Sequence, residues 1–379
     1  MPFTGSGLSG YPLAAAVSML LYLAVVLALW RAAGYAHKSY PLFAVLSVAL
    51  GFLCSRLFYC AVSPACFGEI ASDPLRLFSL SPADHSMLGL LLGVALAAVL
   101  TAKRAKRGSQ SLLDTAALPM GLLLFGLRLA EGLTEELGIG RQVDAGTLTQ
   151  AFPFLFVTEK LGTMELYRLA VFRYEAVFAL LLFGLALLYR RKAAASRPGG
   201  LALLFTLLYC GGQVLFESMR DDGHMVLGFI RVQQLLALLI ILAVLWAVSR
   251  RYARAVHARN TVTAAWALLP VAVFILLIML APINHVLDLS GHIPLGVGLL
   301  AGIGVYLAFF LRRRGANPRL IALWLLTTLA VIGCVLLEFS MDASTNLPRD
   351  YALLALCSLA LLLCPYTLYR RLLTQEVAS

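Results

Sequence analysis

The stretch Tyr209-Cys-Gly-Gly-Gln-Val-Leu-Phe-Glu217-Ser-Met-Arg220-Asp-Asp222 ends an apolar run that begins near Leu201. The run itself is typical of a membrane-spanning helix. At 100° per residue, four polar side chains fall within about 80° of one another and share one helix face: Tyr209, Gln213, Glu217 and Arg220. Ionisable groups inside a span are costly, so function is the default hypothesis for them. The alternatives are a polar seam between helices and a cap at the membrane surface.

The composition is that of an integral membrane protein. Of the 379 residues, 61% are hydrophobic and 13% are charged, whereas soluble domains are about 45–50% apolar and 25% charged. The formal net charge is +11, but the basic residues are spread between apolar runs and do not form one basic domain. We therefore expect membrane lipid and no nucleic acid as a partner. The segment before Tyr11 contains no Lys or Arg, so it lacks the basic region of a signal peptide.

The seven cysteines form no CxxC pair and show no spacing typical of a metal site. Most of them lie in apolar runs, where cysteine behaves as a small hydrophobic residue. A disulfide between Cys60 and Cys66 remains open at this point. We expect neither a bound metal nor a cofactor.

Eleven apolar runs are long enough to cross a membrane, at about 17–25 residues each. They cover residues 12–30, 41–62, 86–102, 112–130, 171–189, 200–217, 229–249, 264–285, 294–311, 319–340 and 350–368. Every odd-numbered run is followed by a basic segment, and such segments stay in the cytoplasm. The sequence therefore predicts an all-α polytopic membrane protein with its N-terminus outside and its C-terminus in the cytoplasm.

The predicted outer side holds nearly all acidic residues, the exceptions being Asp114 and Glu376. Its longest loop, residues 131–170, contains an aromatic run at 152–156. Aromatic rings settle at membrane interfaces, and a loop of this length is more often functional than a plain connector. We interpret it as a lid or a partner surface, with a simple connector as the alternative.

Charged groups within the predicted spans gather before residue 260. The last four runs are plainer, and Glu338 near an outer helix end is compatible with a simple interface residue. We therefore predict a seven-span unit over residues 1–259 and a four-span membrane extension over residues 260–379.

Four outer-side features lie at a similar predicted depth. Arg56 lies toward the outer end of the second span, His85 begins the third, Arg128 ends the fourth, and the opening stretch ends the sixth. Arginines suit a phosphate ester because guanidinium is permanently charged and donates paired hydrogen bonds. A histidine can exchange a proton near neutral pH. The alternative is that such residues snorkel to the interface or cap a helix.

The order of several motifs points to a known family. The segment Gly51-Phe-Leu-Cys-Ser-Arg56-Leu-Phe-Tyr59 is similar to a Gly-Gly-Arg motif followed by aromatic residues. The segment Phe125-Gly-Leu-Arg128-Leu-Ala-Glu131-Gly-Leu-Thr-Glu-Glu136 is similar to Gly-Arg-x-Gly-Asn-x-x-Asn-x-Glu. Further similar segments begin at His85, Arg173, Tyr209 and Gln233. Together, residues 11–250 resemble prolipoprotein diacylglyceryl transferase, a seven-span enzyme of the bacterial cytoplasmic membrane.

The resemblance implies a reaction in which the diacylglyceryl group of phosphatidylglycerol moves to the lipobox cysteine of a prolipoprotein. The product is a thioether, and glycerol phosphate is released. The partners would be phosphatidylglycerol and the prolipoprotein signal peptide, and the site would face the outer leaflet.

The resemblance also implies roles for individual residues. Catalytic residues would be His85 as the base for the thiol and Arg128 at the phosphate, with groups that position them: Glu136, Tyr209 and Glu217. Substrate-binding residues would be Arg56, Arg128, Glu175, Gln213 and Arg220.

The chain also departs from the family pattern. Glu131 and Thr134 stand where the signature has asparagines, and Gln213 stands where the family has an arginine. These changes make the site less favourable for an anionic lipid. Two alternatives therefore remain open: a relative that binds lipid or lipoprotein without transferring it, and a membrane transporter.

Overall fold

A computed structural model describes residues 10–78, 81, 84–134, 137–143, 146–161, 164–192, 198–227, 230–255, 305–306, 308–309, 312–313, 318–341, 349, 352–364 and 367. The chain forms two compact units: Met1–Phe205 with Met219–Met225, and Thr206–Ser218 with Val226–Ser379. The predicted span 264–285 and most of the predicted span 294–311 lie outside the described residues. The predicted boundary at residue 260 lies there too.

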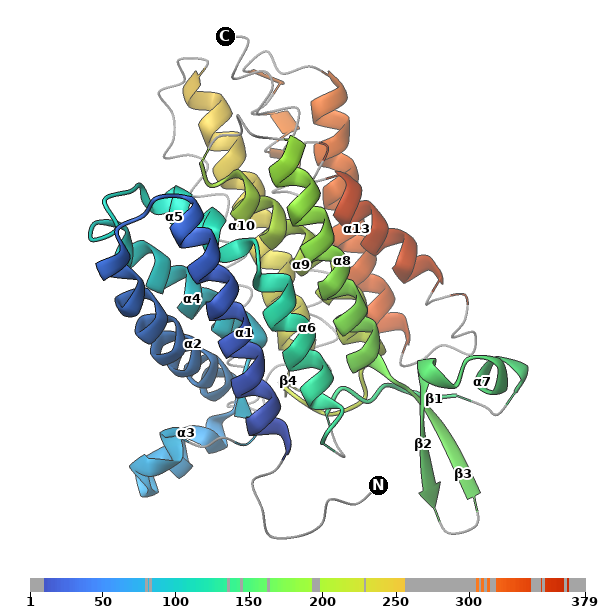
Figure 1. Cartoon of the computed structure of the whole chain (residues 1–379). Helices are drawn as coiled ribbons and strands as arrows, with labels where there is room; N and C mark the ends of the chain where they lie inside the picture. The colour runs from blue at the N-terminus through green and yellow to red at the C-terminus, as the bar shows by residue number, and fades with distance from the viewer. Residues whose placement is uncertain are drawn as a thin grey trace. The chain divides into compact units, whose positions relative to one another are not determined.

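The first unit is a bundle of mostly apolar helices (Figure 1). Its long helices are α1 (Gly10–Ala32), α2 (Tyr40–Val62), α4 (Met87–Ala102), α5 (Ser109–Ala117), α6 (Met120–Glu131) and α8 (Val171–Lys192), with a short 3-10 helix η1 (His37–Ser39) before α2. Helix α2 packs on α4, and α6 packs on both α1 and α8. In hydrocarbon a helix satisfies its own backbone hydrogen bonds, which explains why these runs of Leu, Ala and Val become helices.

Several of these helices are long and apolar enough to cross a membrane. Among the described residues they are Gly10–Ala32, His37–Val62, Val171–Arg191 and Gly200–Met219. Helices α5 and α6 together would make a fifth, although the two are bent by 43°. The chain is therefore a helical protein with four or five membrane-capable helices in its described part.

The predicted run 112–130 is not one straight helix. It is divided between α5 and α6, with Leu118 and Pro119 between them. Proline has no N–H for the hydrogen bond to the preceding turn, and its ring clashes there, which bends a helix at that point. Length and hydropathy alone did not reveal this bend.

Glycines bring α2 and α4 into direct backbone contact. A Cβ on Gly89 would lie 2.5 Å from the Cys54 carbonyl oxygen, and a Cβ on Gly93 would lie 2.2 Å from the Leu50 carbonyl oxygen. Small residues four positions apart commonly allow membrane helices to approach this closely. The contact is fixed at one end because Ser55 Oγ donates to the Ser86 carbonyl oxygen at 2.8 Å.

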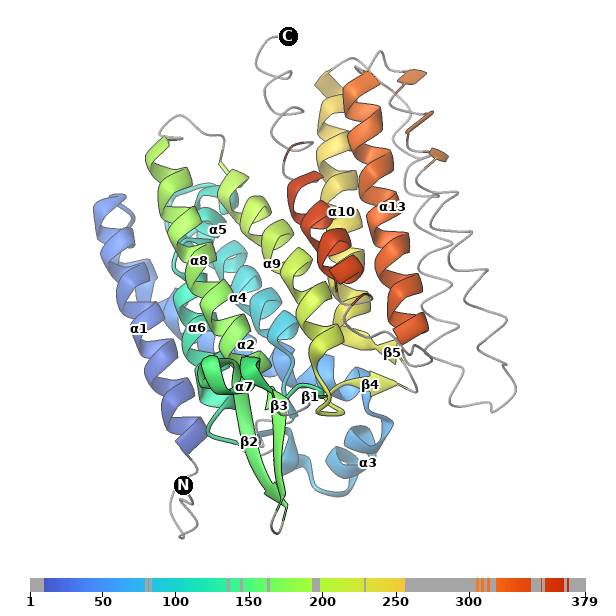
Figure 2. The ribbon, with the colours of Figure 1, turned by 90° about the vertical axis from the view of Figure 1, so that its right-hand side faces the viewer.

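Short elements lie at the end of the first unit where α2 ends and α8 begins (Figure 1). They are α3 (Pro64–Ser72), η2 (Pro74–Phe78), β1 (Gln142–Val143), α7 (Thr147–Ala151), η4 (Pro153–Leu155), β2 (Phe156–Leu161) and β3 (Met164–Leu169). The strands form an antiparallel sheet in the order β1-β3-β2, and β2 and β3 form an extended hairpin (Figure 2).

The prediction of an all-α chain was therefore wrong for the loop 131–170. Thr158 lies opposite Tyr167 in the hairpin, and Glu159 lies opposite Leu166. Strands of six residues with alternating side chains give a far weaker sequence signal than a twenty-residue apolar run.

Helix α9 (Gly200–Met219) begins in the first unit and continues in the second. Its start is capped by Asp114, whose carboxylate accepts from the Gly199 and Ala202 N–H groups at 2.7 and 2.9 Å. A carboxylate at a helix N-terminus satisfies otherwise unpaired N–H groups. Asp114 therefore has a structural role at the start of α9.

The second unit contains the rest of α9, the hairpin β4 (Val226–Leu227) and β5 (Ile230–Arg231), α10 (Val232–Ala255), α13 (Pro318–Met341) and a helix at Ala352–Cys364. Helix α9 meets the Ala352–Cys364 helix closely, since a Cβ on Gly211 would lie 2.9 Å from Leu362 Cδ2. Gln234 Nε2 donates to the Val214 carbonyl oxygen at 3.0 Å, which ties α10 to α9.

Candidate functional site

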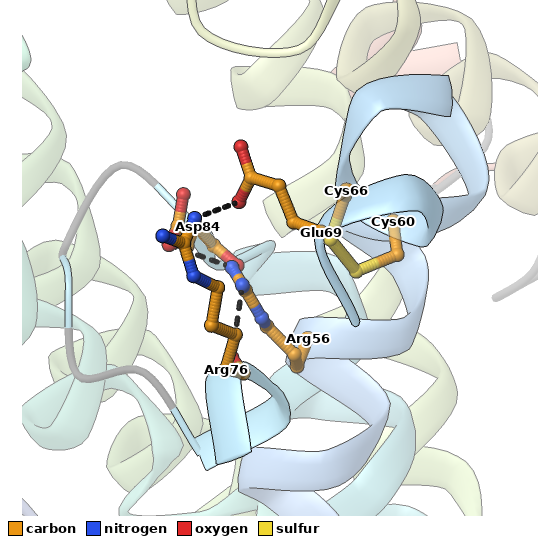
Figure 3. The surroundings of a disulfide bond; sticks show 6 residues. All are labelled: Arg56, Cys60, Cys66, Glu69, Arg76 and Asp84. Atoms are coloured by element: carbon orange, nitrogen blue, oxygen red, sulfur yellow. Dashed lines mark hydrogen bonds and ion pairs between the residues drawn. A yellow bond between two sulfur atoms is a disulfide. The ribbon is translucent and has the colours of Figure 1, made fainter. Parts of the chain in front are cut away.

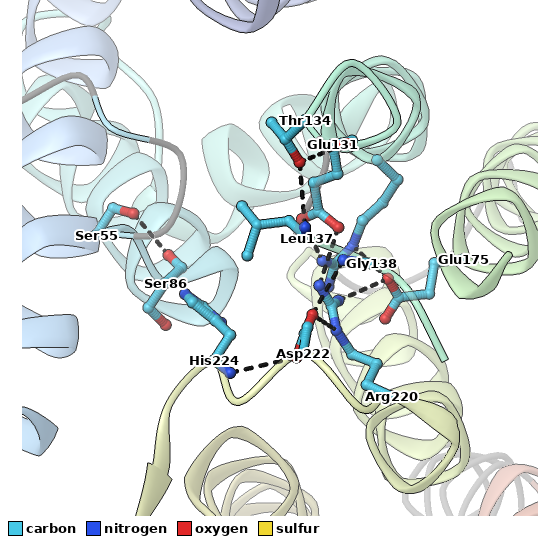
Figure 4. A network of polar contacts seen from close by, with 11 residues as sticks. Ser55, Ser86, Glu131, Thr134, Leu137, Gly138, Glu175, Arg220, Asp222 and His224 are labelled. Atoms are coloured by element: carbon cyan, nitrogen blue, oxygen red, sulfur yellow. Dashed lines mark hydrogen bonds and ion pairs between the residues drawn. The ribbon is translucent and has the colours of Figure 1, made fainter. Parts of the chain in front are cut away.

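Arg220 lies at the centre of a buried ionic cluster (Figure 4). Its three guanidinium nitrogens each contact a different carboxylate. Nε contacts Asp222 Oδ2 at 2.9 Å, Nη1 contacts Glu175 Oε2 at 3.0 Å, and Nη2 contacts Glu131 Oε2 at 3.1 Å. Buried charges are tolerated when they are paired in this way.

Arg128 completes the cluster from α6. Its Nη1 contacts Glu131 Oε1 at 2.6 Å, and its Nε lies 3.0 Å from Glu175 Oε2. Glu131 and Glu175 therefore each connect both arginines. Three carboxylates and two guanidinium groups give this set a formal charge of −1, and all five side chains are almost fully buried.

The backbone around Arg220 explains how it reaches the cluster. Helix α9 ends at Met219, and Arg220 pairs in antiparallel fashion with Gly140. The Asp221 N–H donates to the Ile139 carbonyl oxygen at 2.9 Å. The prediction that Arg220 shares a helix face with Tyr209 was therefore wrong, because this residue leaves the helix and joins the segment after α6.

The turn after α6 supports the same cluster. Gly138 has a φ of +71°, and its N–H donates to Asp222 Oδ2 at 3.0 Å. A positive φ is a conformation that glycine adopts readily. Thr134 Oγ1 donates to the Glu131 carbonyl oxygen at 2.6 Å and accepts from the Leu137 N–H at 3.2 Å. Thr134 thus shapes this turn, whereas predicted Glu136 lies outside the described residues.

Arg56 occupies a second buried position, at the end of α2 (Figure 3). Its Nη1 contacts Asp84 Oδ2 at 2.8 Å, and its Nη2 donates to the Arg76 carbonyl oxygen at 3.1 Å. Its Nε has no hydrogen-bond partner among the residues that the structure describes. The chain segment that carries Arg76 and Asp84 therefore covers Arg56 while leaving one donor of its guanidinium for another acceptor.

His224 joins the two arginine positions and was missed in the sequence. Its ring stacks on Tyr59 with centroids 5.9 Å apart, and the Arg56 guanidinium carbon lies 5.7 Å from the Tyr59 ring centroid. The backbone N–H of His224 donates to Asp222 Oδ1 at 3.3 Å. A histidine two residues after an Asp-Asp pair at a helix end was the available signal.

A family model described as prolipoprotein diacylglyceryl transferase matches residues 4–250. That range contains both arginine positions and covers well over half of the chain. The chain belongs to the prolipoprotein diacylglyceryl transferase family.

Similar curated relatives include the phosphatidylglycerol–prolipoprotein diacylglyceryl transferases of Streptococcus pyogenes serotype M5 (strain Manfredo) and serotype M1. Each is 31% identical to this chain over 96 residues, which is 25% of this chain and 37% of the relative. The matched region thus spans little more than a third of the length of these transferases.

Several of the predicted site residues of this transferase-family chain lie together in the first unit. Arg128, Glu175 and Arg220 meet in the cluster. His85 follows Asp84, the ion-pair partner of Arg56, and packs on Phe52 with ring centroids 5.0 Å apart. Three further predicted residues lie on the part of α9 that belongs to the second unit and are buried: Tyr209, Gln213 and Glu217.

The folded protein should become less stable as the pH falls, because of two groups beside Arg220. Burial, and secondly the charge of Arg220, lower the pKa of His224 to about 4, below the usual value near 6.5. Burial acts to raise the pKa of Asp222, but Arg220 and the Gly138 N–H outweigh it and hold that pKa below its usual range. Both groups bind protons more readily in the unfolded chain, so stability falls as the pH falls.

We expect His224→Gln to remove most of the loss of stability between pH 6.5 and pH 4.5. The free energy of unfolding of the wild-type protein should fall by on the order of 2–3 kcal/mol over this range. The reason is that His224 binds a proton in the unfolded chain at a higher pH than in the folded protein. Thermal unfolding of the detergent-purified chain at these two pH values measures the effect. His37→Gln, at an exposed histidine, is the matched control. An unchanged pH dependence in His224→Gln would show that another group governs acid sensitivity.

The Cys60–Cys66 disulfide, left open by the sequence, is present in the structure with Cα atoms 5.1 Å apart (Figure 3). It ties the end of α2 to α3, one turn beyond Arg56. Three residues after Cys66 on α3, Glu69 Oε2 contacts Arg76 Nη1 at 3.2 Å. The disulfide therefore fixes the start of the segment that covers Arg56.

We expect replacement of both Cys60 and Cys66 by serine to loosen this cover. Closing so short a loop stabilises it by about 2 kcal/mol. Deuterium uptake of peptides from residues 64–78 should rise, while peptides from the middle of α1 should not change. Cys54→Ser, which removes a free cysteine of the same helix, should leave uptake at 64–78 unchanged. Equal uptake in the double variant and the wild type would contradict the proposed role of the disulfide.

Proposed function

We propose that this chain transfers the diacylglyceryl group of phosphatidylglycerol to the lipobox cysteine of a prolipoprotein. The observation that carries the proposal is the family match over residues 4–250, which includes the buried arginine cluster. The curated relatives are named for the same reaction. Phosphatidylglycerol and a prolipoprotein signal peptide would then be the two substrates.

The proposed reaction is a substitution at one glyceryl carbon, preceded by loss of a proton from the thiol. The cysteine thiol gives its proton to a base, for which we propose His85, and the thiolate is the nucleophile. The sulfur attacks the glyceryl carbon that carries the phosphate. The C–S bond forms, the C–O bond breaks, and its electron pair leaves on the phosphate oxygen of glycerol phosphate.

The arginines would stabilise the departing phosphate, because fixed positive charge in a dry site favours developing negative charge. Arg56 Nε is a donor for this purpose, and Arg128 would contribute when the carboxylates around it rearrange. Glu175 and Arg220 would hold Arg128 in place through their ion pairs. Tyr209, Gln213, Glu217 and Glu136 are proposed to position the lipid, as the family resemblance implies.

We also propose how the chain crosses the membrane. The chain would cross a bacterial cytoplasmic membrane eleven times, with its N-terminus outside, its C-terminus in the cytoplasm and its site toward the outer leaflet. A seven-span transferase unit over residues 1–259 would precede a four-span extension over residues 260–379. The sidedness of the basic segments supports this arrangement.

The test in cells is rescue. Expression of the full chain should restore growth and lipoprotein modification in bacteria depleted of their own transferase. Immunoblotting of the membrane fraction verifies that the chain is inserted. Inserted protein without rescue or modified lipoprotein would contradict the proposal.

A second function is favoured by one observation. The two arginines of the cluster are already paired with three carboxylates, as expected for a relative that binds lipid or lipoprotein without transferring it. Such a protein would retain signal-peptide or lipid binding in purified form but form no thioether.

A further inference from the structure

Glu131 is the carboxylate that departs from the family signature, and it lies between the two arginines of the cluster. Oε1 contacts Arg128 Nη1 at 2.6 Å, and Oε2 contacts Arg220 Nη2 at 3.1 Å. The side chain is nearly inaccessible to solvent. One carboxylate thus bridges two guanidinium groups in the way that a phosphate would.

The three carboxylates of the cluster are not equivalent. Asp222 is also held by the N–H groups of Gly138 and His224. The Glu131 carboxylate has hydrogen bonds and ion pairs with Arg128 and Arg220 alone among the described residues. Displacement of the Glu131 carboxylate would therefore free one guanidinium nitrogen on each arginine while breaking no backbone hydrogen bond.

The charge balance points in the same direction. With Glu131 ionised, the five side chains carry a formal charge of −1, and an approaching phosphate monoanion meets net repulsion. A neutral residue at this position would leave the set without net charge and each arginine with an unused donor. At about 4 Å and an effective dielectric constant near 20, the interaction between two unit charges is several times RT.

We propose that Glu131 is an internal counter-ion that sets headgroup specificity: it occupies Arg128 and Arg220 and competes with the anionic phosphate ester of the lipid. The proposal rests on the proposed function, since it takes phosphatidylglycerol as the lipid bound at this site. Glu131 acts through the arginines and is a positioning residue. A lipid binds the cluster only to the extent that its phosphate displaces this carboxylate.

The test measures binding without any acceptor peptide. The purified full chain, the variant Glu131→Gln and the variant Glu131→Asn are titrated in non-ionic detergent with phosphatidylglycerol and, separately, with diacylglycerol, which has the same acyl chains and no phosphate. Native mass spectrometry gives the bound fraction of each lipid. We expect the neutral variants to bind phosphatidylglycerol on the order of tenfold more tightly, with diacylglycerol binding nearly unchanged.

The controls make the result decisive. Glu69→Gln removes a carboxylate from the exposed ion pair with Arg76 and should leave both affinities unchanged. Thermal unfolding identifies which variants are folded, and the asparagine variant serves if the glutamine variant is not. Unchanged or weaker phosphatidylglycerol binding, or an equal gain for both lipids, overturns the proposal.

The same preparations distinguish this proposal from the proposed function. Absence of transfer to a lipobox peptide in every variant would overturn the transferase assignment, while a selective gain in phosphatidylglycerol binding would still establish the role of Glu131. Transfer by the wild type, with no change of lipid affinity in the neutral variants, would support the transferase assignment and overturn the proposed role of Glu131.

Discussion

Arg220→Lys is expected to destabilise the protein by about 3–5 kcal/mol, the usual cost of breaking a buried ionic set from one side. The three nitrogens of Arg220 contact three carboxylates at 2.9–3.1 Å. A lysine ammonium is a single point charge on a flexible stem and cannot reproduce that fork. At least one of Glu131, Glu175 and Asp222 would remain buried with too little compensation.

Thermal unfolding of the detergent-purified chain measures this loss, which should lower the midpoint by about 10 °C. Arg168→Lys is the matched control. Arg168 also contacts two carboxylates, Asp221 and Glu159, but it is more exposed, and exposed pairs contribute about 0–1 kcal/mol. Midpoints that fall equally in both variants, or do not fall in Arg220→Lys, would contradict the assignment of Arg220 as the centre of the cluster.

Gly93→Leu is expected to have the second large effect, through the contact between α2 and α4. Even a Cβ at this position would lie 2.2 Å from the Leu50 carbonyl oxygen and 2.6 Å from the Gly51 Cα. Backbone atoms cannot move aside as a flexible side chain does, so the helices must separate. Overpacking of this kind costs about 1–3 kcal/mol or more.

Separation of α2 and α4 would also disturb the candidate site. Arg56 follows Ser55 on α2, and His85 precedes Ser86 at the start of α4, and the two serines are hydrogen-bonded. Gly93→Leu should therefore lower both the unfolding midpoint and any transfer activity. Gly184→Leu, on α8 with open space around its Cβ position, should change neither. Equal tolerance of leucine at the two positions would contradict the close contact.

The sequence predicted a helical protein with membrane-capable helices, which the described residues confirm, because long apolar runs have few other solutions. Topology also placed Arg128 and Arg220 at a similar depth, and the family resemblance added Glu175 to the same predicted site. The sequence did not predict the break at Pro119 or the hairpin of β2 and β3. Both depend on local backbone geometry that a hydropathy window averages away.

The details of the cluster were harder to predict for a physical reason. Arg220 was placed on the α9 stripe because helical periodicity was continued one residue too far. Its actual partners, Glu131 and Asp222, depend on a chain reversal after α9 and a pairing with Gly140. The spacing of Arg128 and Glu131, three residues apart on one helix, was a usable sign of their ion pair.

The structure changes the interpretation of Glu131, the residue that departs from the family signature. From the sequence it was an added negative charge that disfavours an anionic lipid. In the structure it is a bridging ligand of two arginines. The same residue therefore stabilises the fold of the cluster and restricts what the cluster can bind.

The most direct test of the account is diacylglyceryl transfer by the purified full chain. The chain is placed in liposomes of phosphatidylglycerol with labelled acyl groups, together with a lipobox peptide. We predict that the peptide gains a diacylglyceryl group on its cysteine as a thioether, that a serine version of the peptide gains none, and that His85→Gln reduces the rate by about 10²–10⁴-fold. No modified peptide from folded, inserted protein would contradict the account.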